Sequence, residues 1–391
     1  MEGDISMNRE NAWTTYEEAD IKALEGLCKE YKDFLSNGKT ERECVAQSIE
    51  LAKKAGYQDL EELIKNQTPL KAGNKVYRTW MEKTIALFQI GEDAIEDGLN
   101  ILGAHIDSPR LDLKQNPLYE DTEMALLDTH YYGGVKKYQW VTIPLALHGV
   151  VVKKDGTKID VVVGEEETDP VVMVSDLLIH LAAEQQQKKA AEVIAGEDLN
   201  ILVGSMPLEG EEKEAVKANI LKLLKEKYDF EEEDFMSAEI EIVPAGKARD
   251  LGLDRSMVAG YGHDDRICAY TSLLALLETE SVKKTSVVLL VDKEEVGSIG
   301  ATGMQSRFFE NAVAELMDRV GEYSELKLRR ALANSKMLSS DVTAAFDPNY
   351  AGAYEKKNSA FFGKGLAFAK YTGARGKSGC NDANAEFVAW L

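Results

Sequence analysis

The chain has 391 residues, of which 44% are hydrophobic and 29% are charged, and its formal net charge at pH 7 is −22. This composition is ordinary for a globular protein and excludes an intrinsically disordered chain, while the length leaves room for two domains. Nucleic acids and anionic membranes would repel so acidic a chain, so neither is expected as a partner. The four cysteines are scattered singly, and we find no secretion signal and no apolar run that could span a membrane, which together predict a cytoplasmic protein.

Periodicity in the N-terminal part predicts two helices followed by two strands. These elements are expected at residues 15–37, 40–56, 75–78 and 84–90. Thr40 and Glu43 have the spacing of a capping box, so the second helix is expected to begin there. We interpret both helices as packing elements.

The next apolar run, residues 99–104, predicts a strand that leads into His105 and Asp107. Side chains two positions apart in an extended segment point to the same side, so His105 and Asp107 are expected on one face. This spacing suits a metal-binding histidine with a carboxylate that orients it. A His-x-Asp triplet taken alone is more often structural, and this one gains weight from its position at a strand end.

From about residue 116 to about residue 244 the pattern changes character. Residues 146–153 and 157–163 flank an Asp-Gly pair, which is a strong signal for a β-hairpin. Polar helices are expected at residues 176–190 and 210–229. The segment therefore predicts a β-rich α+β domain inserted into the chain.

Two features of this segment stand apart from its plain polar character. Residues 133–140, GGVKKYQW, form a glycine-rich loop with basic and aromatic side chains. His180 lies in the apolar context LLIHLA, which by itself favours a core or interface histidine over a catalytic one.

Residues 262–266, GHDDR, precede an apolar helix expected at residues 267–278. The helix dipole favours carboxylates at an N-terminus, so one interpretation of Asp264 is a plain N-cap. An aspartate at this position can equally bridge two cations. Further along, a short strand at residues 337–338 leads to Asp341, another carboxylate expected at a strand end.

Residues 286–303, SVVLLVDKEEVGSIGATG, are the stretch around which a site is expected to form. The apolar run predicts a strand buried on both faces, and it leads into Asp292, Glu294 and Glu295. In open α/β sheets, ligands bind at the carboxyl ends of the strands. Neighbouring side chains of an extended segment point to opposite sides, so one glutamate can bind a metal while the other moves protons. A solvated turn is the alternative, against which the buried strand and the following glycines count.

The C-terminal part predicts a strand at residues 362–371 and a helix that starts at Asn381. A glycine-rich basic loop lies between them. Its cations can pair with an acidic first residue of a peptide substrate, with a solvated loop as the alternative. These cations are Lys370, Arg375 and Lys377.

Side chains from distant parts of the sequence are thus expected at the ends of elements in one α/β sheet. They are His105, Asp107, Asp264, Glu294, Glu295 and Asp341. Imidazole and carboxylate ligands suit two zinc ions (Zn²⁺), or Co²⁺ or Mn²⁺ as substitutes, and metal-assisted hydrolysis is the natural chemistry of such a site. The sequence has no GxGxxG after a first strand, no GxxxxGK[ST] and no GxSxG, so dinucleotide, NTP and serine-hydrolase functions lack support.

These residues also carry a family resemblance. Five motifs in order, GAHIDSPRLDLK, YGHDDR, VDKEEVGSIGATG, SSDVTAAFDP and SGCNDANAEF, are similar to those of the aspartyl-aminopeptidase family, a branch of the di-zinc exopeptidases. The resemblance covers nearly the whole chain. It implies a mixed sheet flanked by helices in a catalytic domain of residues 1–115 and 245–391, and an inserted dimerisation domain of residues 116–244.

The resemblance also implies a role for each candidate ligand. His105, Glu295 and Asp341 match metal ligands, and Asp264 matches the ligand that bridges the two ions. The function implied is removal of the N-terminal residue from peptides by a zinc enzyme.

The remaining candidates match residues that act around the metal. Glu294 matches the general base, and Asp107 matches the acid that supports His105. His180 matches a histidine that reaches toward the site of a neighbouring subunit. Members of the family resemble one another in forming shells of subunits, so a homo-oligomer built from dimers is expected.

In one respect the sequence departs from the family. Members have a histidine near the C-terminus that completes the coordination of the second metal, whereas none of the five histidines here follows His263. We therefore expect the last section of the catalytic domain to be lacking and the second metal site to be compromised. The alternative function is a weakly active or inactive relative that serves as an assembly or binding subunit.

Overall fold

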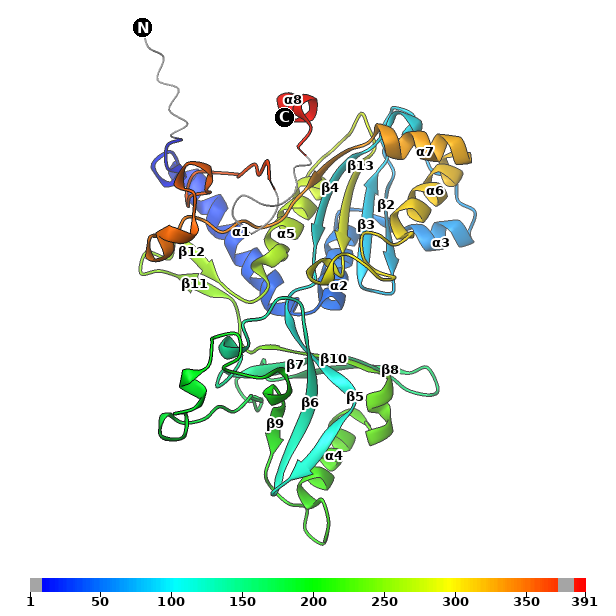
Figure 1. The fold of residues 1–391 in the computed structure, drawn as a ribbon. Coiled ribbons are helices and arrows are strands. Elements are labelled where there is room, and N and C mark those ends of the chain that lie inside the picture. The colour runs from blue at the N-terminus through cyan, green and yellow to red at the C-terminus, as the bar shows by residue number, and fades with distance from the viewer. Residues whose placement is uncertain (1–8, 372–382) are drawn as a thin grey trace. The chain divides into compact units, whose positions relative to one another are not determined.

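A computed structural model describes residues 9–371 and 383–391 of the chain (Figure 1). It divides into two compact units, one formed by residues 28–341 and the other by residues 1–27 with residues 342–391. Every candidate site residue from His105 to Asp341 belongs to the unit formed by residues 28–341, which is called the first unit below. No helix in the described ranges is long and apolar enough to cross a membrane.

The first unit contains a six-stranded mixed sheet, which confirms the predicted α/β class. In spatial order its strands are β1 (Gln58–Asp59), β2 (Lys75–Trp80), β3 (Thr84–Gln89), β13 (Ser286–Val291), β4 (Asn100–His105) and β14 (Lys336–Ser339). Strand β3 runs antiparallel to β13, whereas β13, β4 and β14 are mutually parallel. The carboxyl ends of these three strands therefore meet at one edge of the sheet.

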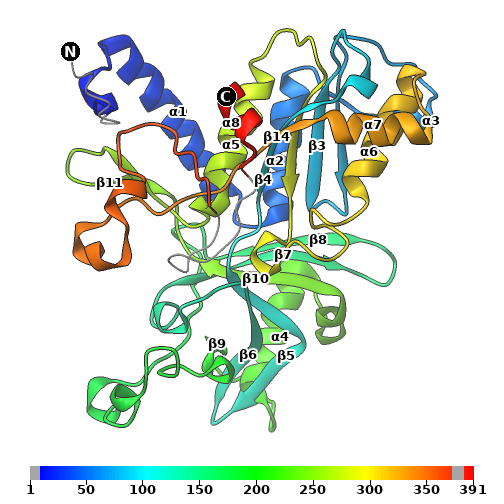
Figure 2. The same ribbon diagram turned by 45° about the horizontal axis from the view of Figure 1, so that its top comes forward.

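Helices cover both faces of this sheet (Figures 1 and 2). On one face lie α2 (Glu41–Lys54), α5 (His263–Leu277) and the part of α1 (Glu18–Asn37) that belongs to the unit. On the other face lie α3 (Leu60–Lys65), α6 (Phe308–Val320) and α7 (Glu325–Asn334). Thr40 and Glu43 form the predicted capping box at the start of α2.

Strand β13 is buried on both faces, as its sequence predicts. Val288 and Leu290 pack in the core beneath α2 and α5, whereas Val287 and Leu289 pack in the core beneath α6 and α7. Each fully buried side chain of this kind stabilises the fold by about 1.5–3 kcal/mol. The strand is therefore firmly held, and so is its carboxyl end at Val291.

A second six-stranded sheet in the same unit is entirely antiparallel. In spatial order it consists of β8 (Lys158–Val163), β7 (Leu145–Val152), β10 (Ala238–Pro244), β5 (Arg110–Asp121), β6 (Met124–Tyr132) and β9 (Ile201–Gly204). Helix α4 (Ala215–Tyr228) packs against it and shares its core (Figure 2). The predicted hairpin at β7 and β8 is confirmed. The sheet begins at Arg110, six positions before the predicted insertion, and the domain division at residues 116–244 stays a prediction.

Three elements differ from their prediction. Residues 176–190 form two short 3-10 turns, Ile179–Leu181 and Gln185–Gln187, where a helix was predicted. Helical propensity alone does not stabilise a short helix, and the large apolar side chains of this segment, Leu177, Leu178, Ile179 and Leu181, are more than half exposed. The helix predicted at residues 210–229 begins later, at Ala215.

The predicted strand at residues 362–371 is also wrong. Gly363 and Gly365 have φ angles of 71° and 89°, in the left-handed region that glycine tolerates, and these angles interrupt an extended segment. The helix predicted from Asn381 is present as α8 (Ala385–Trp390), capped by Asn384, while Asn381 itself lies outside the described residues.

Candidate metal centre

The parallel strands deliver the candidate ligands to one edge of the first sheet. His105 is the last residue of β4 and pairs with Val291, the last residue of β13. Asp341 follows β14, in which Ser339 pairs with Gly103 of β4. Asp264 comes from the start of α5, which packs against β4. The predicted convergence at strand ends therefore follows from the strand order and direction.

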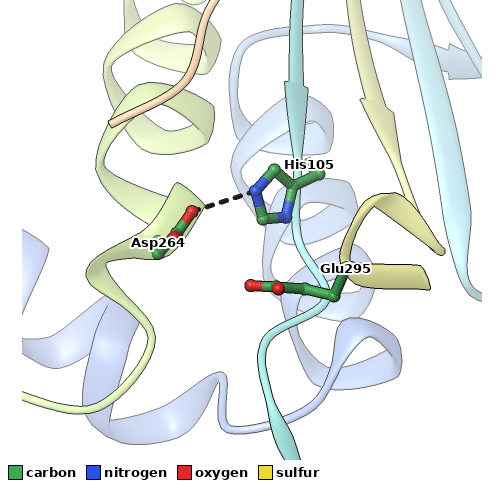
Figure 3. Close-up of side chains that lie close together, drawn as sticks. All are labelled: His105, Asp264 and Glu295. Atoms are coloured by element: carbon green, nitrogen blue, oxygen red, sulfur yellow. Dashed lines mark hydrogen bonds and ion pairs between the residues drawn. The ribbon is translucent and has the colours of Figure 1, made fainter. Parts of the chain in front are cut away.

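Asp264 is not a plain N-cap. The N-cap position of α5 is Gly262, two residues earlier, and Asp264 itself has extended backbone angles of φ −87° and ψ 106°. Its Oδ1 lies 3.0 Å from His105 Nε2, and its backbone carbonyl accepts a hydrogen bond of 2.7 Å from Ser108 Oγ. The side chain is thus aimed at the imidazole, toward the same point as Glu295 (Figure 3).

The segment after β13 turns immediately, which corrects the argument that Glu294 and Glu295 lie in an extended chain. Lys293 has a φ of 72°, and residues Glu294–Val296 form a single 3-10 turn that ends at Gly297, with a φ of 94°. A glycine is favoured at this last position because the left-handed region is costly for other residues. The backbone amides of both glutamates point toward Asp107 as a result of the turn.

Asp107 is fully buried and joins the parts of the centre. Its Oδ1 accepts from the backbone amide of Glu294 at 3.1 Å and lies 3.3 Å from His105 Nδ1. The same His105 nitrogen also donates to the backbone carbonyl of Asp107 at 2.9 Å. Its Oδ2 accepts from the backbone amide of Glu295 at 3.2 Å and from the hydroxyl of Tyr132 at 2.6 Å. Asp107 therefore holds the imidazole through its backbone carbonyl and its carboxylate, and it holds the backbone of both glutamates through the carboxylate.

The second ring nitrogen of His105, Nε2, faces a group of carboxylates. Its Nε2 lies 3.8 Å from Glu294 Oε2 and 3.8 Å from Asp341 Oδ1, in addition to the contact with Asp264. The ligand atoms of His105, Asp264 and Glu295 lie within 4.8 Å of one another, and His105 forms a second such group with Asp265 and Asp341. In a tetrahedral zinc shell with bonds of about 2.0–2.2 Å, ligand atoms lie about 3.3–3.6 Å apart, so these separations fit a divalent ion.

Buried carboxylate oxygens without a hydrogen-bond partner also indicate a cation site. Among the described side chains, Glu295 Oε1 and both carboxylate oxygens of Asp265 are buried without a hydrogen-bond partner. A buried carboxylate oxygen without a partner is costly unless a cation or a donor satisfies it. The donor set of one imidazole and several carboxylates therefore fits zinc or a similar divalent ion.

The pKa values show the same crowding of negative charge. Burial, followed by repulsion from Asp264, raises the pKa of Glu295 to about 7. Burial likewise raises the pKa of Asp265 to about 7 and raises the pKa of Glu294. Burial opposes protonation of His105, but its hydrogen bonds to the surrounding aspartates outweigh this and raise its pKa. A bound cation would replace these protons.

His180 is not part of this cluster. His180 lies in the exposed turn Ile179–Leu181, which contradicts a core position, and no hydrogen bond or ion pair in the described part of the chain joins it to His105. Arg375 and Lys377 lie outside the described residues, and Lys370 belongs to the other compact unit.

Two residues of the site were missed at the level of sequence. Asp265 could have been found, because it stands beside Asp264 in the same GHDDR motif. Tyr132 could not, because its contact with Asp107 joins the end of β6 to the end of β4 and no local spacing signals it.

A cavity of about 280 Å³ opens beside Asp264. Residues that line it include Ser108, Gly134, Lys136, Gln139, Trp140 and Asp264. One part of the wall comes from the glycine-rich segment at residues 133–140, and the rest comes from residues 108–109 and 261–264. This segment is close to the metal centre, since a Cβ added to Gly133 would lie 3.2 Å from Glu295 Cβ.

Comparison with known proteins gives consistent matches. Residues 34–390 match the family model described as aminopeptidase I zinc metalloprotease (M18). A Clostridium acetobutylicum protein named "Probable M18 family aminopeptidase 1" is 63% identical over 392 residues, covering 100% of this chain and 84% of that one. The crystal structure of an M18 family aminopeptidase from Thermotoga maritima is 46% identical, with a TM-score of 0.90 over 98% of this chain and 83% of that chain. The mApe1 dodecamer of yeast shares the fold at 21% identity, with a TM-score of 0.69 over 87% of this chain and 76% of that chain.

Proposed function

The chain belongs to the M18 family of zinc aminopeptidases, and from this premise we propose that it removes the N-terminal residue of peptides at a di-zinc centre. His105, Asp264, Glu295 and Asp341 would hold the ions. The observation that carries the proposal is the convergence of His105, Asp264 and Glu295 from three separate elements (Figure 3). Imidazole with carboxylates is the donor set of hydrolytic zinc sites.

Glu294 is assigned as the general base. Zinc, when bound, supplies a polarised water and a polarised substrate carbonyl. Glu294 Oε2 takes a proton from the attacking water and returns it to the leaving amine. Its carboxylate is half-exposed, faces the same space as His105 Nε2 and is absent from both groups of ligand atoms. Burial raises its pKa, which brings a carboxylate closer to the range useful for a base at neutral pH.

Metal removal tests this proposal. Purified protein is expected to release p-nitroaniline from aminoacyl p-nitroanilides, to lose this activity after dialysis against EDTA, and to regain it with Zn²⁺, Co²⁺ or Mn²⁺. An N-acetylated substrate serves as the control, because an aminopeptidase requires a free amino group. Tight zinc binding without hydrolysis of any substrate would favour the assembly or binding subunit instead.

We propose that the cavity beside Asp264 receives the substrate and that Lys136 favours an acidic side chain there. The lysine lines the cavity, and its side chain makes no ion pair with any described residue. The chain is strongly acidic, with a net charge of −22, so a lysine next to the metal centre that pairs with no described carboxylate stands out. It can pair with the carboxylate of a first residue Asp or Glu.

Replacing Lys136 by Gln is expected to raise KM for Asp-p-nitroanilide about tenfold, because a hydrogen bond to a charged group contributes about 1.5–3 kcal/mol. The KM for Leu- and Ala-p-nitroanilide is expected to stay within twofold. The matched control is Lys137→Gln, since Lys137 donates instead to the backbone of Ala191 and stacks on Tyr131. An equal change for all three substrates would refute a pairing with the acidic side chain.

A homo-oligomer in which dimers build a larger shell is proposed as the assembly. The turn around His180 exposes apolar side chains to more than half of their full extent: Leu177, Leu178, Ile179 and Leu181. Contiguous apolar exposure of this kind marks interaction surfaces. The dodecamer of the distant yeast relative is compatible with this assembly, and residues 116–244 would supply the contact that brings His180 toward a neighbouring subunit.

A further inference from the structure

We propose that Tyr132 is a positioning residue of the metal centre, by which the second sheet fixes the geometry of the zinc ligands. Its hydroxyl holds Asp107, and Asp107 in turn holds His105 and the backbone of both glutamates. The inference rests on the proposed function, because it assumes that His105 binds zinc. The second sheet would then help to position the metal ligands, separately from any role in oligomerisation.

The contact between Tyr132 and Asp107 is short and buried. The tyrosine hydroxyl donates to Asp107 Oδ2 at 2.6 Å, and the two residues are 8% and 0% exposed. Tyr132 is the last residue of β6, where it pairs with Arg110 of β5. It is therefore anchored in the second sheet, while Asp107 follows the strand of the first sheet that carries His105.

The tyrosine ring is itself held from its faces by cations. The guanidinium of Arg110 lies 3.8 Å from the ring centroid, and Lys293 Nζ lies 5.1 Å from it. Arg110 is fixed in turn by Asp112 at 2.9 Å and Glu241 at 3.3 Å. A ring packed in this way cannot move its hydroxyl away from the carboxylate without disturbing buried ion pairs.

Loss of the hydroxyl has a specific consequence. Among the described residues, Asp107 Oδ2 would keep only the amide of Glu295 as a donor, and Asp107 is 0% exposed, so water does not readily replace the hydroxyl. A carboxylate with fewer donors is less well oriented toward the imidazole that it supports, and partners that orient a metal-bound histidine typically contribute 10–100-fold to metal affinity.

The test is the zinc affinity of Tyr132→Phe, measured by competition with a chromophoric chelator, which does not depend on activity. We expect binding about tenfold weaker than in the unaltered protein, with unchanged circular dichroism. The matched control is Tyr131→Phe, since Tyr131 is the neighbouring residue and is 43% exposed, and its affinity is expected within twofold. A zinc affinity of Tyr132→Phe within twofold would overturn the inference.

A double-mutant cycle separates a positioning role from general destabilisation. If Tyr132 acts through Asp107, Tyr132→Phe should change zinc affinity by less than threefold in an Asp107→Asn background. Equal effects in both backgrounds would overturn the inference. Zinc binding that responds to Tyr132→Phe in a protein without peptidase activity would instead overturn the proposed function and leave the positioning role in place.

Discussion

Replacement of Glu294 by glutamine is expected to lower kcat about 10²–10⁴-fold while zinc content stays near that of the unaltered protein. The amide keeps the size and the contacts of the side chain but cannot accept a proton from water. Asp107 binds the backbone amide of Glu294, so its hold on the turn does not depend on this side chain. Rates on Leu- and Asp-p-nitroanilide and zinc content by atomic emission are the measurements.

The neighbouring variant Glu295→Gln is the matched contrast. Glu295 belongs to the group of ligand atoms with His105 and Asp264, so its loss of charge is expected to lower metal occupancy as well as activity. The two variants therefore separate binding from proton transfer at adjacent positions of one turn. If Glu294→Gln lost its zinc and Glu295→Gln kept it, the two roles would have to be exchanged.

The sheet that carries the site was predictable because its strands have strong local signals. The apolar run of β13 and the run before His105 are both long enough to indicate buried strands, and each ends in side chains of the types that can bind metals. The rule that ligands bind at the carboxyl ends of parallel strands then placed these residues together without any knowledge of the strand order.

The details of the site were less accessible, because they depend on single backbone angles and on long-range contacts. The separate roles of Glu294 and Glu295 were deduced from an extended chain. The structure has a turn there instead, because Lys293 adopts a left-handed conformation. Similarly, residues 176–190 have a helical sequence, but their large apolar side chains are more than half exposed and the segment forms short turns. The contact between Tyr132 and Asp107 joins two sheets, and nothing near either residue indicates it.

Asp107→Asn is expected to disrupt the centre more than the loss of one charge would suggest. Each oxygen of Asp107 accepts from a backbone amide, Oδ1 from Glu294 and Oδ2 from Glu295. An asparagine has only one acceptor oxygen, so in either orientation its amino group faces a backbone N–H that also donates. Burial alone would raise the pKa of Asp107, but hydrogen bonds from His105 and Tyr132 outweigh it and hold the pKa below the usual value, so the charged form is the one that the site stabilises.

For Asp107→Asn we therefore expect zinc affinity to fall about 10–100-fold and kcat at saturating zinc to fall as well, since the turn that carries the proposed base is displaced. The matched control is Asp292→Asn, at a position that is also 0% exposed and follows the adjacent strand. Asp292 accepts from the amide of Lys293 and from the hydroxyl of Thr302, and that hydroxyl can reverse to accept from an asparagine. Burial raises the pKa of Asp292, whereas the pKa of Asp107 is lowered, so loss of the charge is expected to cost less at Asp292, although its Oδ2 lies 3.7 Å from Lys293 Nζ. Zinc titration of both variants is the measurement, and equal losses of affinity would show that the effect comes from the strand ends in general and not from the contacts of Asp107.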